Sequence, residues 1–190
     1  MNRYWGLLIF LFFSSSVRAQ LDFFHEELEF GIDSVSFSVK GNYFFRNQSG
    51  REIKPVIYFP VGKTEGKNPI DKILVFDQKD PGHPYRVHVV DSVADFELAI
   101  PAFGQKQIVL YYRQQHDGKQ VRYILTSTRH WKKPLEFASY KLVIQKNIKI
   151  RKFSMKPDKV SDFGNTRIYS WEKKNFMPTG EFTVLFTIKR

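Results

Sequence analysis

The sequence contains no cysteine among its 190 residues. Disulfide bonds, thiolate metal ligands and cysteine nucleophiles are therefore excluded, and so is a lipid anchor attached through a thiol. Acidic residues are also few: 19 Asp and Glu stand against 30 Lys and Arg, giving a formal charge of +11 and a pI near 9.7. Aromatic residues make up 16% of the chain, and 42% of all residues are apolar. This composition excludes a disordered or collagen-like chain and supplies enough bulky surface for one sizeable core.

The amino terminus has the pattern of a secretory signal peptide. Arg3 gives a basic start, an apolar run extends from Tyr4 to Phe13, and small residues follow up to Ala19. The run is shorter than the roughly 20 residues that a membrane helix needs. We expect cleavage after Ala19, which would remove residues 1–19 and leave residues 20–190 as one secreted or periplasmic domain without a membrane span. The absence of cysteine favours a bacterial source for such an exported domain.

The rest of the chain alternates between apolar and polar residues with a period of two. The clearest apolar rows lie within Val35–Phe45 and Phe182–Ile188, and shorter rows occupy Ile108–Tyr112 and Val121–Leu125. A period of two is typical of strands that bury one face and expose the other. The pattern therefore predicts an all-β protein, folded as a single antiparallel β-sandwich.

Turn residues separate these rows at short intervals, as expected for many short strands. Phe103-Gly104 and His116-Asp117-Gly118 are examples, and the longer stretches Gly62–Pro69 and Asp77–Pro84 are interpreted as loops. No stretch of ten or more residues carries a good helical stripe of apolar residues. Only Pro134–Tyr140 is compatible with a single helical turn.

Basic residues are concentrated in one part of the chain. Between Arg129 and Lys159 there are ten Lys and Arg and two acidic residues, a surplus of eight. If Leu142 to Ile150 formed one strand, its aliphatic residues would share a face and its cations would share the other. The two interpretations are a docking surface for an anionic partner and a solvated face that prevents strand pairing. The residues predicted for the docking surface are Trp131, Lys132, Lys133, Lys141, Lys149 and Arg151.

Motifs for several chemistries are missing. Gly62–Lys67 resembles a phosphate loop but has the wrong glycine spacing, and Asn68 follows its lysine where Ser or Thr is needed. The five histidines form no metal-binding pair, and no G-x-S-x-G elbow is present. We therefore expect no catalytic, cofactor or metal site, and nothing in the chain favours nucleic acid as a partner.

Two alternatives to a simple binding module remain open. The acidic residues of His25-Glu26-Glu27, with Glu29, could supply paired carboxyls for a glycan-acting hydrolase. Trp131, Tyr111 and Trp171 are candidate rings for stacking on a sugar, as in a carbohydrate-binding module. Acids at the start of a strand are more commonly surface groups, and the alternation assigns most aromatic residues to the core.

The order of segments resembles a known family. Gly41–Asn47 leads into a turn and then Pro55–Pro60, and later come Phe96–Gly104 and Ile108–Tyr112. This is similar to the VIT-type (vault/inter-α-trypsin), Ig-like β-sandwich and to the N-terminal sandwich of some metallo-aminopeptidases. The resemblance covers about residues 35–112 and implies an all-β module without a catalytic site of its own. Beyond it, the chain resembles small uncharacterised secreted bacterial proteins.

Together these observations predict an exported, non-catalytic binding module of the bacterial envelope. Its predicted partner is an envelope protein or an anionic glycan or lipid surface, bound through the basic residues.

Overall fold

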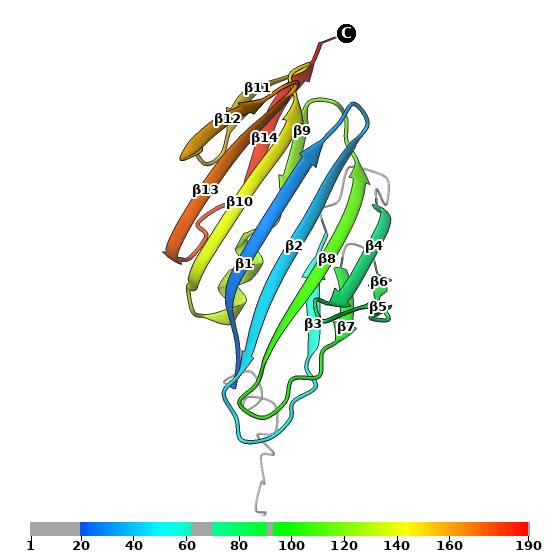
Figure 1. Ribbon diagram of the computed structural model, residues 1–190, viewed down its shortest axis with the longest axis vertical. Helices are drawn as coiled ribbons and strands as arrows, with labels where there is room; N and C mark the ends of the chain where they lie inside the picture. The colour runs from blue at the N-terminus through cyan, green and yellow to red at the C-terminus, as the bar shows by residue number, and fades with distance from the viewer. Residues whose placement is uncertain (1–19, 62–69, 91–92, 190) are drawn as a thin grey trace, which may run out of the picture.

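The computed structural model describes residues 20–61, 70–90 and 93–189, and Figure 1 gives their arrangement. The expected signal peptide, residues 1–19, and the expected loop at residues 62–69 lie outside the described residues. Within the described part, the chain forms fourteen β-strands and one short 3₁₀ helix. The all-β prediction is therefore confirmed.

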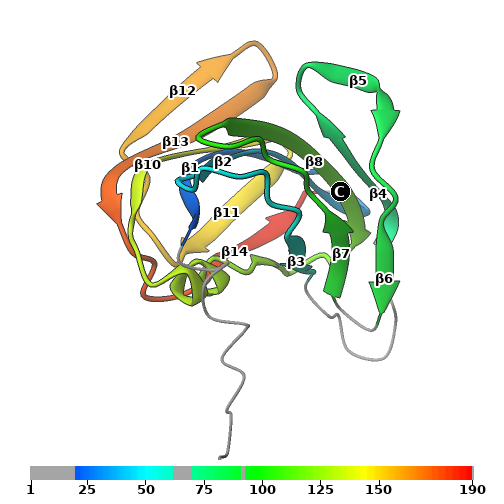
Figure 2. The same ribbon diagram turned by 90° about the horizontal axis from the view of Figure 1, so that it is seen from below.

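The strands form one large sheet and two small ones (Figures 1 and 2). The large sheet has eight strands in the order β12-β13-β10-β1-β2-β8-β4-β5. Their bounds are β1 Leu21–Ile32, β2 Ser36–Asn47, β4 Ile70–Asp77, β5 Asp80–Pro84, β8 Gln105–Gln115, β10 Leu135–Gln145, β12 Lys159–Phe163 and β13 Thr166–Phe176. One small sheet has the order β11-β14-β9, formed by Ile148–Phe153, Phe182–Ile188 and Gln120–Tyr123. The other has the order β3-β7-β6, formed by Val56–Pro60, Val93–Glu97 and His88–Val90.

The large sheet arches over the two small sheets, and the core lies between these two layers (Figure 2). Aromatic rings from the two layers meet there. The ring of Phe30 in β1 lies 4.5 Å from that of Phe182 in β14, and the ring of Tyr112 in β8 lies 5.9 Å from that of Phe59 in β3. The alternation predicted this inward orientation correctly, because side chains on a strand point to opposite faces in turn. Phe37, Phe45 and Phe186 are 0%, 3% and 2% exposed.

The alternation predicted purely antiparallel sheets, but one pair of the described strands is parallel. β1 and β10 pair in parallel, with His25 opposite Phe137 and Ile32 opposite Ile144. A parallel pair needs a long crossover connection, and here the chain passes through both small sheets before β10 returns beside β1. Local alternation carries no information about that pairing.

The stretch Asp77–Pro84 is half of a hairpin rather than a loop. β5 follows β4 after a turn at residues 78–79 and pairs with it: Phe76 lies opposite Pro84, and Asp77 lies opposite Asp80. Its prolines are compatible with pairing because β5 is an edge strand, where a missing N–H group costs no ladder bond.

The helical turn also lies elsewhere than predicted. Residues Leu135 to Tyr140 belong to β10, and the 3₁₀ helix η1 spans Thr126–Trp131. It ends at Lys132, which adopts the left-handed conformation with φ of 57°. None of the described helices is long and apolar enough to cross a membrane.

The single strand expected over Leu142 to Ile150 is two strands in different layers. A turn at residues 146–147 ends β10 in the large sheet and begins β11 in a small sheet. Leu142, Ile144 and Ile148 are all buried, as the alternation predicted. The predicted continuous stripe of cations is wrong, because β10 and β11 expose their outward faces on opposite sides of the molecule.

Candidate functional site

The outward face of the β11-β14-β9 sheet is cationic, and we call it the basic sheet. Its three strands contain Arg122, Lys149, Arg151 and Lys152, all exposed, and no acidic residue. None of these four cations has an ion-pair partner among the described residues. Their charges therefore face solvent without local neutralisation, which creates a positive potential over this face.

The carboxylates that border the basic sheet are engaged with backbone groups. Glu181, just before β14, accepts hydrogen bonds from the N–H of Leu125 at 2.7 Å and from the hydroxyl of Thr126. Asp117, just before β9, accepts from the N–H groups of Lys119 and Gln120, which lowers the pKa of its carboxyl. Neither carboxylate forms an ion pair with a cation of the basic sheet.

A β-bulge explains why two neighbouring cations are both exposed. The register of β11 against β14 shifts between Ile150 and Lys152, so Arg151 is an extra residue. In a regular strand, consecutive side chains point to opposite faces, and one of the two cations would face the core. The bulge interrupts that alternation, and both Arg151 and Lys152 lie in solvent.

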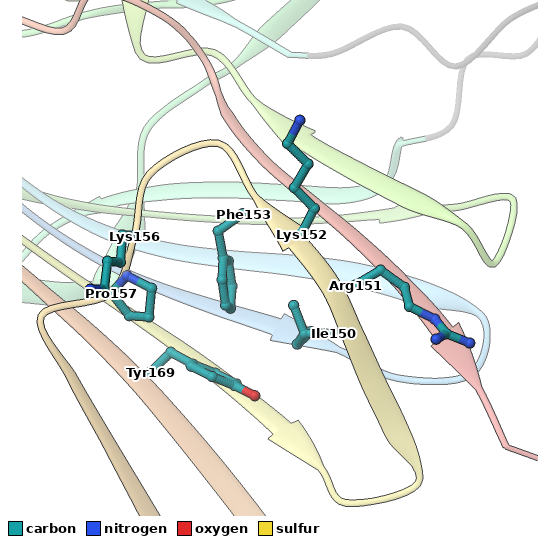
Figure 3. A pocket seen from close by; sticks show the side chains of 7 residues that line it. All are labelled: Ile150, Arg151, Lys152, Phe153, Lys156, Pro157 and Tyr169. Atoms are coloured by element: carbon teal, nitrogen blue, oxygen red, sulfur yellow. The ribbon is translucent and has the colours of Figure 1, made fainter.

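A shallow, open depression of about 400 Å³ adjoins the basic sheet where β11 lies against β13 (Figure 3). Its apolar part includes Phe153 and Tyr169, whose ring centroids are 4.9 Å apart. Its charged part is the three cations Arg151, Lys152 and Lys156. The complete lining consists of Ile150, Arg151, Lys152, Phe153, Lys156, Pro157 and Tyr169. We call this depression the β11 pocket.

A buried tryptophan fixes one wall of the β11 pocket. The indole N–H of Trp171 donates a hydrogen bond to the carbonyl oxygen of Met155 at 3.0 Å, and Trp171 itself is fully buried. This bond holds the connection between β11 and β12 against the core, and so positions Lys156 and Pro157 beside Tyr169. Trp171 is consequently a core residue and not the sugar-stacking ring considered from the sequence.

The six predicted surface residues lie in three places. Lys149 and Arg151 are on the basic sheet. Lys141 is on the outward face of the large sheet, opposite Glu29 of β1. Trp131, Lys132 and Lys133 lie at the end of η1. The two clusters away from the basic sheet do not extend it.

Three cations of the site were missed from the sequence. Arg122 stands on the polar side of the predicted row Val121–Leu125, so the alternation could have identified it as outward-facing. Lys152 and Lys156 belong to the basic stretch between Arg129 and Lys159, but the period of two places Lys152 on the buried side. Lys152 is exposed because of the β-bulge, which the sequence pattern does not reveal.

Trp131 is a core-capping residue rather than an exposed platform. Its ring lies 5.7 Å from the rings of both Phe23 and Phe45. Tyr111, the remaining sugar-stacking candidate, is half-buried on the outward face of the large sheet. The three rings therefore form no common flat surface.

The acidic cluster in the middle of β1 is divided between the two faces of the strand. Glu26 points into the core and is 2% exposed, whereas Glu27 and Glu29 point outward. Tyr140 donates a hydrogen bond from its hydroxyl to Glu26 at 2.6 Å, and burial raises the pKa of this carboxyl to about 7. Glu26 therefore lies on the opposite face of the sheet from Glu27 and Glu29, so it cannot face either of them across a cleft as glycoside hydrolysis requires.

The core around Glu26 also contains a buried pair of tyrosine hydroxyls. The hydroxyls of Tyr43 and Tyr123 are 2.8 Å apart, and burial raises the pKa of both phenols well above the usual value. Gly41 makes room for this arrangement, since a Cβ at that position would lie 2.3 Å from the ring of Tyr43. These groups satisfy one another inside the protein and are closed to a ligand.

Comparison with known proteins finds one family that resembles part of the chain in sequence, and several solved structures that resemble the chain in fold. Residues 105–185 match the family described as a domain of unknown function (DUF4424). The matched segment runs from the beginning of β8 into β14, so it includes the β11 pocket and most of the basic sheet. No curated protein matches the chain.

Solved structures share the arrangement of strands. A protein from Legionella pneumophila described as a "putative nutrient binding protein" superposes with a TM-score of 0.69 at 13% identity, over 88% of this chain and 67% of that one. An M1 zinc metallopeptidase from Deinococcus radiodurans superposes with a TM-score of 0.55 at 8% identity, over 87% of this chain and 42% of the peptidase. A two-domain M1 zinc metallopeptidase variant gives 0.56 at 9% identity, again over 42% of its length.

At these identities the likeness concerns the fold alone. The M1 metallopeptidase structures agree with the expected similarity to a metallo-aminopeptidase sandwich. The finer assignment to a VIT-type or Ig-like sandwich stays a prediction. The chain spans less than half the length of the peptidases, so their zinc-dependent activity carries no argument for this protein.

Proposed function

We propose that the protein is an exported, non-catalytic binding module of the bacterial envelope that holds an anionic partner on its basic sheet. In this proposal residues 1–19 are a cleaved signal peptide, and residues 20–190 form a β-sandwich of the VIT-type or Ig-like kind. The observation that carries the proposal is the cluster of Arg122, Lys149, Arg151 and Lys152, four exposed cations that have no carboxylate partner among the described residues and lie in strands that contain no acid.

Two further observations support a binding role. The Legionella pneumophila protein with the same fold is described as a putative nutrient binding protein. Of the acidic residues considered for hydrolysis, Glu26 is buried and lies on the opposite face of β1 from Glu27 and Glu29, and the rings considered for sugar stacking are buried or far apart. These placements favour a binding surface over a glycan-acting hydrolase or an aromatic sugar platform.

Charge reversal tests the proposal. The triple variant R122E/K149E/K152E is compared with K132E/K133E/K141E, which changes the net charge equally at predicted residues outside the basic sheet. The probes are dextran sulfate and phosphatidylcholine vesicles with or without phosphatidylglycerol, each at low and at high salt. Each exposed cation near an anionic surface contributes about 1 kcal/mol, so we expect the first variant to lose about a hundredfold in affinity at low salt.

The control variant should bind nearly as well as the unchanged protein. Equal losses in the two variants would indicate attraction by net charge alone and would overturn the assignment to the basic sheet. No binding of any anionic probe by the unchanged protein at low salt would overturn the proposal as a whole.

A further inference from the structure

β11 is an edge strand whose outer side is unpaired. It pairs with β14 alone among the described strands, and the order β11-β14-β9 leaves its other side open. Natural edge strands are usually short, charged or bulged, because a free row of backbone N–H and C=O groups invites another strand. β11 has a bulge and three cations, yet its free side opens into the β11 pocket instead of being covered.

The ladder identifies which backbone groups face outward. Lys189 donates its N–H to the carbonyl of Asn147, and Phe186 donates its N–H away from β11, to Lys119. Because bonded and non-bonded pairs alternate in an antiparallel ladder, Ile150, opposite Phe186, directs its N–H and C=O to the free side. The bond from the Ser154 N–H to Thr183 gives Phe153 the same orientation by the same alternation.

Backbone groups, an apolar surface and cations therefore meet at one edge. Ile150 and Phe153 contribute both outward backbone groups and side chains of the β11 pocket. Tyr169, 9% exposed, lies across from them on β13. Arg151, Lys152 and Lys156 stand around the same depression without ion-pair partners among the described residues.

Resting on the proposed function, we infer that the partner is a protein whose extended acidic segment adds to β11 as a fourth strand. Strand addition takes its affinity from main-chain hydrogen bonds and its selectivity from pockets for alternate side chains. An apolar side chain of the segment would contact Phe153 and Tyr169, and flanking carboxylates would pair with Arg151, Lys152 and Lys156. The cations that repel a basic strand would select an acidic one.

This occupant is favoured over a lipid or polysaccharide surface because such surfaces need only charge. They would leave the N–H and C=O groups of Ile150 and Phe153 without a role, and they would not require an apolar depression beside the edge. β11 is six residues long, about 20 Å, which matches one short extended segment.

The test uses a fluorescent peptide of about eight residues in which Glu and Val alternate. Fluorescence anisotropy measures its binding to the full chain. A second peptide has the same sequence with alternate backbone nitrogens methylated, so its charge is unchanged but its main-chain donors are lost. We expect the methylated peptide to bind about tenfold more weakly, and a Lys-Val peptide not to bind.

Two measurements on the protein side locate the peptide. The amide hydrogens of Ile150 and Phe153 should exchange more slowly when the Glu-Val peptide is bound, while that of Lys149, already bonded to β14, serves as an internal reference. Ile150→Pro removes the outward N–H without removing a bond to β14, and should weaken binding about tenfold. If that variant fails to fold, the methylated peptide still decides the question on the unchanged protein.

The outcomes separate the two proposals. If dextran sulfate or anionic vesicles bind but methylation of the peptide has no effect, the proposed function stands and strand addition is wrong. If the Glu-Val peptide and every other anionic probe fail to bind at low salt, both are wrong. Slower exchange confined to Arg122 and β9 would also overturn the assignment to β11.

Discussion

At the scale of single residues, Glu26 links the stability of the core to pH. In the unfolded chain this carboxyl titrates near 4.5, and in the folded protein its pKa is raised to about 7 by burial. Between these pH values the folded protein retains a proton that the unfolded chain has released. The folded state therefore loses stability as the pH rises through this window, and the loss is complete above about pH 7, amounting to roughly 3 kcal/mol.

Replacing Glu26 with Gln should remove this dependence. Glutamine is neutral at every pH, and its carbonyl oxygen can still accept the hydrogen bond from Tyr140. Relative to the unchanged protein, we expect E26Q to gain stability as the pH is raised from 5 to 8. Urea unfolding across this range provides the measurement, with E27Q on the exposed face as the control. Parallel stability curves for E26Q and the unchanged protein would contradict the prediction.

At the scale of elements, the connection after β2 depends on one buried amide. Asn47 is 1% exposed, and its Nδ2 donates to the carbonyl oxygens of Arg51 at 2.7 Å and Pro101 at 2.8 Å. Its Oδ1 accepts from the N–H of Ser49 at 2.9 Å. The side chain thus ties two separate turns together, and the backbone groups that it satisfies would otherwise be orphaned in a buried place.

Asn47→Ala should destabilise the fold by about 2–4 kcal/mol, because the buried carbonyls and the Ser49 N–H lose their partner at once. Asn165→Ala is the matched control, since Asn165 is an exposed turn residue whose side chain makes no hydrogen bond to the described residues. Thermal unfolding of both variants measures the difference. A loss no larger than that of the control would show that the two turns are held by other contacts.

The strands also show which parts of the fold can be predicted from the sequence. The rows of β2, β8 and β14 were predicted correctly because alternation is a local property of each strand. The break between β10 and β11 was missed because a two-residue turn preserves the parity of Leu142, Ile144, Ile148 and Ile150. The β-bulge at Arg151 and the parallel pairing of β1 depend on distant partners, so no local pattern reports them.

For the candidate site, composition led to the right region but not to the right surface. The surplus of basic residues after Arg129 does include Lys149, Arg151, Lys152 and Lys156. Their separation from Lys141 and Lys133 is a consequence of the chain crossing between layers. The pocket residue Tyr169 is brought to β11 only by the packing of one layer on the other.

At the scale of the whole molecule, the two small sheets present different surfaces side by side in one layer. The β3-β7-β6 sheet contains no Lys or Arg, and it exposes Tyr58 and Val90 at 67% and 65%. The basic sheet contains no acid. A protein with this division can orient a charged partner, because only one part of the layer attracts an anion.

Export is the remaining prediction for the whole chain. Expressed with its leader in a Gram-negative host, the protein should accumulate in the periplasmic fraction, and its mass should be that of a chain whose first residue is Gln20. Deletion of residues 2–19 should leave the product in the cytoplasm. Intact-mass spectrometry of both fractions provides the measurement, and a full-length chain retaining Met1 in the periplasm would contradict cleavage after Ala19.

The parallel pairing of β1 with β10 has a consequence for how the molecule forms. The first strand cannot gain its second neighbour until residues about 110 positions later have emerged, as the pairing of His25 with Phe137 requires. Closing so long a loop is slow, although β1 gains its first neighbour, β2, across a short turn. A nascent chain would thus keep one side of β1 unpaired while it is being synthesised, and the large sheet would stay incomplete until β10 follows.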